Sequence, residues 1–263
     1  ILQMIKLKSK EEIARLKSGG KILAGILRVL ESYTMDNYKS GSLTTKMIDD
    51  RAEQLLILNG VKPSFKNLFY EGVKMPYPAS TCISVNDEVV HGIPSDKVLK
   101  EGDLVGIDMG IIYDDLYTDA AISFILGVPR KEDEMMLRVT EAALYAGIKE
   151  AIPGNTIGDI GFAIEKHIRD AGFGLVKDYC GHGVGYSVHE EPSVPNYGRR
   201  GSGEIIEEGL VIAIEPMVVL GSGDVYLDKN GWTVKTDDGK RSAHFEHTVA
   251  ITEDGPVILT ALS

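Results

Sequence analysis

One pattern occurs twice in this chain of 263 residues, and this internal repeat constrains the fold more than any other feature. In each half, a His-x-x-Pro motif precedes a loop, an acidic residue with glycine, and an apolar strand that ends in a carboxylate. The first copy runs from His91 to Asp108 and the second from His189 to Glu215. A charge at the end of a buried strand is costly unless it is paired or holds a metal. The repeat therefore predicts two half-sites that face each other across a pseudo-twofold axis and form a metal site.

Length and charge limit the organisation of the chain and its classes of partner. A chain of this length is near the upper size for one hydrophobic core, so the repeat favours one domain over residues 4–263, with halves of about 4–128 and 129–263. Met4 is expected to be the native start, and residues 1–3 a cloning remnant. The formal net charge is −11 and no basic run is present, so we expect no specific nucleic-acid binding.

Cysteine use and hydropathy indicate the compartment. Cys82 and Cys180 are the only cysteines and form no CxxC motif, so a disulfide framework is not expected. The sequence contains neither an apolar run of about 18 residues nor a signal-peptide pattern. We therefore expect a cytoplasmic protein without membrane association.

Helical periodicity predicts two helices at the start of each half. The first helix follows a capping box of the Ser-x-x-Glu kind at Ser9, and the second is expected from about 43 to 58. In the second half, helices are predicted over 131–152 and 156–171. Two helices followed by strands, twice over, predict a duplicated α+β domain.

A predicted hairpin brings two carboxylates together. Strands over 104–112 and 117–126 are joined by a short connection, and a turn centred between positions 113 and 114 places Asp108 directly opposite Asp119, with Cβ atoms about 5 Å apart. Two carboxylates that close repel each other unless a proton or a cation lies between them. The alternative is a polar surface pair on an edge hairpin, but the apolar residues on both sides argue against it.

Three further side chains complete a candidate ligand set. His182 lies among three glycines in residues 180–185, a pattern that suits a ligand on a short loop and equally a glycine-rich turn in which the histidine only caps a hydrogen bond. Glu215 closes an apolar strand. Glu246 lies in an alternating stretch that turns Phe245 and His247 to the opposite face.

The chemistry of this set predicts two divalent ions. Oxygen-rich ligands with one imidazole suit Mn, Fe, Co or Zn ions. Four carboxylates and a bridging hydroxide carry five negative charges, and a single divalent ion would leave too much charge buried at low dielectric. The predicted ligands are Asp108, Asp119, His182, Glu215 and Glu246.

Taken together, these motifs resemble those of type I methionine aminopeptidases, the short form of the pita-bread metallopeptidases, over nearly the whole chain. The matching features are the spacing of eleven between Asp108 and Asp119, and residues 180–185, 189–192, 214–217 and 246–248. The resemblance implies a single catalytic metallopeptidase domain with the pita-bread fold, in which two pseudo-twofold-related halves surround a central curved antiparallel sheet with helices outside. It also implies that Asp119 and Glu246 bridge the metals, that Asp108 binds one, and that His182 and Glu215 bind the other.

The resemblance also implies catalytic and substrate-binding roles. Glu215 would move the proton of the nucleophile, His189 would hydrogen-bond the oxyanion, and His91 would contact the scissile amide. Tyr77, Cys82 and Trp232, together with His91 and His189, would contact the substrate, and Tyr77, Cys82 and Trp232 would line its methionine pocket. The alternative for these three is ordinary packing.

Two other histidines, and three places where the sequence departs from the pattern of the family, concern the surroundings of this site. His167 is expected at the surface, whereas His244 shares the face of Glu246 and is left open between a contact of the site and the core. Relatives often carry an aromatic residue in place of Val188 and usually carry glycine in place of Thr118, and the segment 66–75 is longer than expected for the short form. These departures concern the shape of the pocket.

The expected activity is removal of the initiator methionine from nascent polypeptides, with a preference for small second residues. Nascent N-termini are the implied partners, the resemblance leaves open a transient contact with the ribosome, and we expect a monomer. One alternative is a proline-specific aminopeptidase or prolidase, whose relatives usually carry a further N-terminal domain. The other is a non-catalytic binding protein on the same fold, which would typically lack ligands that are all present here.

Overall fold

The computed structural model describes residues 5–70 and 73–261. The expected native start at Met4 and the three residues before it lie outside the described part. The same holds for residues 71 and 72 within the segment 66–75.

A nine-stranded antiparallel sheet forms the centre of the molecule, in the order β1-β4-β5-β14-β9-β7-β8, with β2 paired to β4 and β15 paired to β14. Strand β14 bonds to β5 on one side and to β9 on the other, so it joins the two halves. The strands are β1 (Lys62–Pro63), β2 (Cys82–Val85), β4 (Leu104–Tyr113), β5 (Leu116–Ile125), β7 (Gly181–Gly183), β8 (Glu190–Val194), β9 (Val211–Ile214), β14 (Glu246–Thr252) and β15 (Gly255–Ile258).

Two small antiparallel sheets accompany the large one. The first has the order β13-β10-β6, and the second has the order β11-β12-β3. Their strands are β3 (Glu88–Val90), β6 (Gly174–Leu175), β10 (Met217–Val219), β11 (Val225–Leu227), β12 (Val234–Thr236) and β13 (Ser242–His244).

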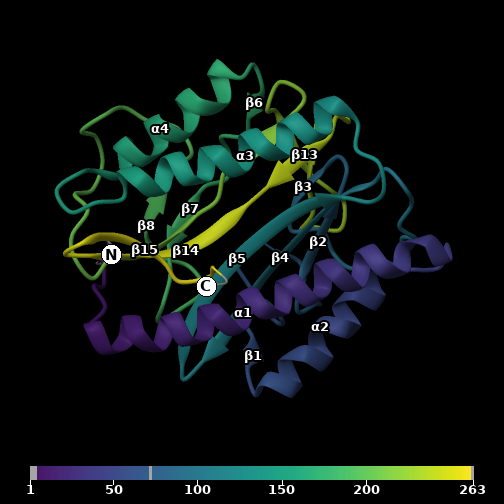
Figure 1. Cartoon of the computed structure of the whole chain (residues 1–263), viewed down its shortest axis with the longest axis horizontal. Helices are drawn as coiled ribbons and strands as arrows, with labels where there is room; N and C mark the ends of the chain where they lie inside the picture. The colour runs from purple at the N-terminus through teal and green to yellow at the C-terminus, as the bar shows by residue number, and fades with distance from the viewer. Residues whose placement is uncertain (1–4, 71–72, 262–263) are drawn as a thin grey trace.

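Within the described residues, four long helices lie outside the sheet, one pair for each half (Figure 1). Helices α1 (Lys10–Asn37) and α2 (Thr45–Asn59), with the short 3₁₀ helix η1 (Tyr38–Ser40) between them, cover one half. Helices α3 (Lys131–Glu150) and α4 (Ile157–Asp170) cover the other. No helix among the described residues is both long and apolar enough to span a membrane. The arrangement confirms the predicted duplicated α+β architecture with helices outside an antiparallel sheet.

Local capping explains where the helices begin. The predicted capping box is present at α1, where Ser9 Oγ accepts from Glu12 N and Glu12 Oε2 accepts from Ser9 N. Helix α2 begins two residues later than predicted, because Thr44 caps it by accepting from Met47 N at 3.2 Å. Thr156 is the N-cap residue of α4, where its N and Oγ1 both donate to Asp159 Oδ2, and this helix begins one residue later than predicted.

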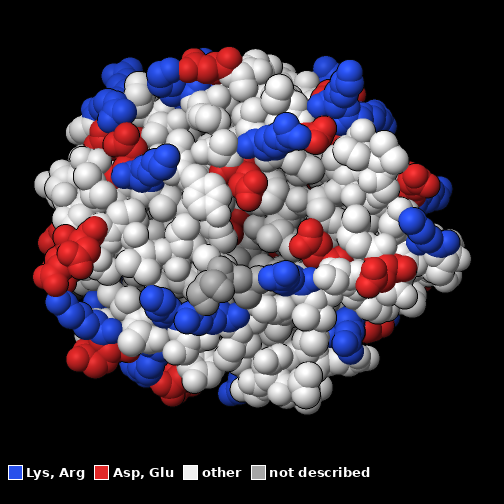
Figure 2. All heavy atoms as spheres, viewed as in Figure 1, with Lys and Arg blue, Asp and Glu red and all other residues white. Residues whose placement is uncertain are grey.

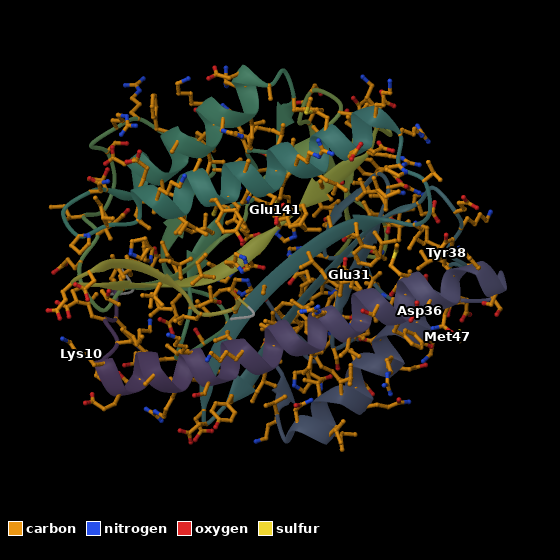
Figure 3. All side chains as sticks on the ribbon, in the orientation of Figure 1. Lys10, Glu31, Asp36, Tyr38, Met47 and Glu141 are labelled. Atoms are coloured by element: carbon orange, nitrogen blue, oxygen red, sulfur yellow. The ribbon has the colours of Figure 1, made fainter. Side chains whose placement is uncertain are left out.

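Two large buried clusters hold the helix pairs on the sheet. One joins α3 and α4 to strands of the second half, and the other joins α1 and α2 to β2, β4 and β5. Between the helix pairs, Glu31 of α1 and Glu141 of α3 line a groove on the outer side of the sheet (Figure 3). On the face seen in Figure 2, acidic and basic side chains are interspersed, and no large patch of one sign forms.

The hairpin of β4 and β5 differs from its predicted register. Tyr113 pairs with Leu116, so Asp108 lies opposite Ala121 and not opposite Asp119. The prediction was wrong by two residues, because Asp114 and Asp115 both have positive φ, at 50° and 58°, and form a two-residue turn that moves the centre of the hairpin. A shift of two preserves the face of every side chain. Asp108 and Asp119 therefore remain on the same face, as diagonal neighbours.

Candidate metal centre

A cavity of about 540 Å³ lies where the two halves meet. Residues from both halves line it, and it contains every side chain that the sequence singled out as a ligand, a catalytic residue or a pocket residue. These are Tyr77, Cys82, His91, Asp108, Asp119, His182, His189, Glu215, Trp232 and Glu246.

Neighbouring strands of the central sheet place the five candidate ligands. Asp108 lies on β4 and Asp119 on β5, and Glu246 begins β14 opposite Ala121 of β5. Glu215 follows β9 directly, and β7, which carries His182, pairs with β9. The strand order β4-β5-β14-β9-β7 therefore gathers ligands that are far apart in the sequence.

The glycines beside His182 allow two strands to approach closely. A Cβ atom on Gly181 would lie 2.3 Å from Ala213 O, and one on Gly183 would lie 2.3 Å from Glu191 O. His182 therefore sits within strand β7, and the expected short loop at this position was wrong. Its Nδ1–H donates to Gly183 O at 2.9 Å, which leaves Nε2 free on the side of Glu215.

The ligand atoms form a tight, buried group. One ligand atom each from Asp119, His182 and Glu246 lie within 4.8 Å of one another, and His182 Nε2 lies 3.6 Å from Glu215 Oε1. Asp108, Asp119 and Glu246 each have a buried carboxylate oxygen without a hydrogen-bond partner in the described part of the chain. Buried oxygens without partners are what a bound cation would satisfy, so the residues fit divalent metal ions.

The pKa values of these carboxyl groups report the same crowding. Burial, followed by the charge of Glu215, raises the pKa of Asp119 to about 8, and burial raises the pKa of Glu215 to about 7. Burial and the neighbouring carboxylates hold the pKa values of Asp108 and Glu246 well above their usual range. Without a cation, the four groups cannot all be ionised at neutral pH.

This crowding predicts a pH-dependent stabilisation by metal. Because the folded-state pKa values lie above the unfolded ones, the contribution of these carboxyl groups to stability is lost as the pH rises through 7 to 8. A bound metal ion balances the charge of the ionised groups, so the metal-loaded protein does not lose this stability as the pH rises. At constant free metal, we expect the difference in free energy of unfolding between metal-loaded and metal-free protein to grow by on the order of 2 kcal/mol from pH 6 to pH 8. Urea unfolding with and without a chelator measures it, and a difference that shrinks with pH would contradict the pKa assignments.

Neutral histidines surround the group. Burial, with smaller effects from His244 and His182, lowers the pKa of His91 to about 4. Enclosure of the ring in the cavity, followed by the nearby His182, whose ring centroid is 4.2 Å away, lowers the pKa of His189, although the residue as a whole is exposed. Both rings are therefore neutral at physiological pH and act as hydrogen-bonding groups.

The structure also settles where the remaining two histidines of the sequence analysis lie. His244 Nε2 lies 3.3 Å from Glu215 Oε2, so the side chain contacts a candidate ligand. Burial lowers the pKa of His244 to about 3. His167 is exposed on α4, as predicted.

An apolar cluster forms one wall of the cavity. The rings of Tyr77 and Trp232 meet edge to face, with centroids 5.2 Å apart, and Cys82 pairs with Asp108 across β2 and β4. Val188, a departure from the pattern of the relatives, is buried in this cluster. Sequence reasoning missed three lining residues of the segment next to Tyr77, which its aromatic content could have indicated: Phe65, Leu68 and Tyr70.

A buried ion pair connects the start of the chain to this cavity. Lys8 Nζ lies 2.6 Å from Glu190 Oε2, and the two side chains are 1% and 6% exposed. The other oxygen of Glu190 accepts from Ser187 N at 2.8 Å. The pair therefore ties the segment before α1 to the loop that carries His189. Sequence reasoning also missed this contact, since the partners are 182 residues apart.

Comparison with known proteins identifies the class to which this fold and site belong. The profile of Metallopeptidase family M24 matches residues 16–253. The chain belongs to metallopeptidase family M24.

Individual relatives show to which group within family M24 the chain is similar. The chain is 43% identical over 259 residues to a methionine aminopeptidase of Clostridium perfringens, with 98% of this chain and 100% of that protein covered. The crystal structure of methionine aminopeptidase from Thermotoga maritima matches with a TM-score of 0.89 at 40% identity, covering 98% of this chain and 100% of that one. Within family M24, the chain thus belongs with the methionine aminopeptidases, and its pita-bread fold is confirmed.

A prolidase is similar to this chain in fold at low sequence identity. The prolidase of Pyrococcus horikoshii matches with a TM-score of 0.75 at 23% identity, and covers 98% of this chain but only 64% of its own. At this identity the likeness concerns the fold.

Proposed function

We propose that the protein is a metallo-exopeptidase that removes the N-terminal methionine from polypeptides, through a single catalytic domain over residues 4–263. The observation that carries this proposal is the group of four carboxylates, three buried and one half-buried, and one imidazole, with unpartnered oxygens, beside an apolar pocket in one cavity. The names of the relatives point the same way.

The five ligands would hold two divalent ions, of Co, Mn, Fe or Zn. Asp119 and Glu246 would bridge both ions, Asp108 would bind one, and His182 and Glu215 would bind the other. The short distances among Asp119, His182 and Glu246 support this arrangement. Four carboxylates in a buried site also carry more charge than one divalent ion balances. Ions bound there would lower the pKa of a water molecule and polarise the scissile carbonyl.

The chain's own residues would move the protons and hold the substrate. Glu215 lies against His182 and His244, and would take the proton of the attacking water and pass it towards the leaving amine. His189, as a neutral imidazole, would donate to the developing oxyanion. His91, also neutral, would contact the scissile amide. The free α-amine of the substrate would bind beside the metal ligands, which restricts cleavage to the first residue.

The apolar cluster would accept the methionine side chain. Tyr77, Cys82 and Trp232 provide apolar walls, which suit a long and polarizable thioether. Val188 is smaller than the aromatic residue often found there, so this side of the pocket would be roomier. We expect methionine to exceed leucine and norleucine, but by a modest factor, because one methylene is worth only about 1–3 kcal/mol.

Peptide hydrolysis by metal-reconstituted protein tests the proposal. We expect kcat/KM to be highest for methionine at the first position and for Ala, Gly or Ser at the second. Two peptide series, Met-X and X-Ala, measure both preferences. A preference for proline at the second position would favour a proline-specific aminopeptidase or prolidase. The absence of hydrolysis with both metal sites filled would favour a binding protein on the same fold.

Nascent polypeptide N-termini would be the substrates, and the cytoplasm the place of action. The two free cysteines, one buried and one half-buried, are compatible with a reducing compartment. We further propose that the protein acts as a monomer, with at most a transient contact with the ribosome.

A further inference from the structure

The segment that departs from the short-form pattern carries a tyrosine into the cavity. The flanks of this segment are fixed to the pocket wall, because Asn67 N donates to Tyr77 O and Tyr77 N donates to Leu68 O, each at 2.8 Å. Trp232 Nε1 donates to Met75 O at 3.0 Å. Tyr70 lies between these anchors and lines the cavity.

The contacts of Tyr70 lead to one proposed catalytic side chain. Its hydroxyl is hydrogen-bonded to Nδ1 of His189. The two rings meet edge to face with centroids 5.7 Å apart, and the Tyr70 ring lies 6.1 Å from that of Trp232. Packing against two rings of the site, together with a hydrogen bond, fixes the hydroxyl relative to the imidazole.

The direction of this hydrogen bond follows from the acidity of the two groups. The pair is partly exposed, so water also has access to the Tyr70 hydroxyl. A phenol, with an ordinary pKa of about 10, is a stronger donor than the N–H of a neutral imidazole, and an unprotonated ring nitrogen is a stronger acceptor than a phenolic oxygen. Burial and the charge of Asp119 also raise the pKa of Tyr70, so the phenol keeps its proton. The phenol therefore donates to Nδ1, and a neutral imidazole must then carry its own proton on Nε2.

We propose that Tyr70 is a positioning residue for His189, which it holds in the Nε2–H tautomer. Nε2 then faces the substrate as a hydrogen-bond donor. An imidazole in the other tautomer would present a lone pair to the developing oxyanion and would repel it. The inference rests on the proposed function, because that function supplies the substrate to which His189 would donate a hydrogen bond. The tautomer of His189 itself does not depend on activity.

Tyr70→Phe tests the inference kinetically, because it removes the hydroxyl and keeps the ring against Trp232. We expect kcat on a Met-Ala peptide to fall about tenfold, as for the loss of one hydrogen bond of ordinary strength, with KM changed less than about twofold. In a His189→Ala background, the same substitution should have no further effect, because the group that Tyr70 positions is gone. Tyr226→Phe, at an exposed tyrosine of β11 outside the cavity, is the matched control and should leave kcat unchanged.

The tautomer of His189 provides a readout that needs no activity. In ¹⁵N-histidine-labelled, Zn²⁺-loaded protein, long-range ¹H–¹⁵N spectra distinguish Nε2–H from Nδ1–H, and His189→Ala identifies the signal. We expect Nε2–H in the wild type and a shift towards Nδ1–H in Tyr70→Phe. An Nδ1–H signal in the wild type, or a tautomer and kcat unchanged by Tyr70→Phe, would overturn the inference. If the wild type shows the expected tautomer but cleaves no methionyl peptide, the proposed function fails and the Tyr70–His189 positioning is upheld.

Discussion

Asp119→Asn is expected to abolish peptide hydrolysis and to lower the metal content of the protein. Asparagine has nearly the same shape but carries no charge, so it cannot bridge two cations as a carboxylate does. Loss of a partner that only orients a metal ligand typically costs about 10–100-fold in metal affinity or activity. Loss of the proposed bridging ligand itself should exceed that range. Metal analysis and kcat/KM on a Met-Ala peptide measure both effects.

Two controls separate this effect from misfolding. Asp115→Asn makes the same chemical change at an exposed position of the same hairpin, and should leave metal content and activity unchanged. The metal-free Asp119→Asn protein should be at least as stable as the metal-free wild type, because one of four crowded carboxyl groups no longer ionises. Two ions at full occupancy in crystals of Asp119→Asn would show that Asp119 does not bridge them.

The site could be predicted from sequence largely because strand periodicity is robust to small errors. The register of the hairpin was predicted two residues away from the observed one, yet Asp108 and Asp119 stay on one face because side chains alternate with a period of two. An error of one residue would have placed one carboxylate on the outer face. The internal repeat likewise indicated which strands carry candidate ligands, since β4 and β9 both bring a carboxylate to the same cavity. Only β9 ends at its carboxylate as predicted, because β4 continues to Tyr113 and so holds Asp108 in its middle.

Other features depend on contacts that no local pattern encodes. The three glycines in residues 180–185 favoured a short loop at His182, whereas the close approach of Ala213 and Glu191 to the flanking glycines makes it a strand. The role of Tyr70 depends on where a long segment returns to the pocket wall. The path of this segment is fixed by tertiary hydrogen bonds, such as the one between Trp232 and Met75. Tertiary hydrogen bonds of this kind produce no periodic pattern in the sequence.

His189→Ala is expected to lower kcat by about 10²-fold or more while both metal sites stay filled. His189 lies in the cavity outside the five-ligand set, with a neutral ring whose centroid is 4.2 Å from that of His182. Removal of one donor to an oxyanion typically costs about 10²–10³-fold in kcat. KM should change much less, because the hydrogen bond is made chiefly in the transition state.

Steady-state kinetics combined with metal analysis checks this expectation. His167→Ala, at an exposed position on α4, is the control for the removal of an imidazole and should behave as the wild type. A collapse of metal content in His189→Ala would mean that His189 is itself a ligand. The assignment of His182 would then need revision.

The buried ion pair between Lys8 and Glu190 has a consequence for the timing of synthesis. Lys8 is made 182 residues before its partner, and at about 5–20 residues per second this delay is roughly ten to forty seconds. During that time the cap of α1 can form, but the segment before it has no partner for its charge. The ion pair can help to fix the loop that carries His189 only after Glu190 has been made and has met this early segment. We therefore expect the newborn protein to acquire activity late, once its first residues have bound a loop made in its last third.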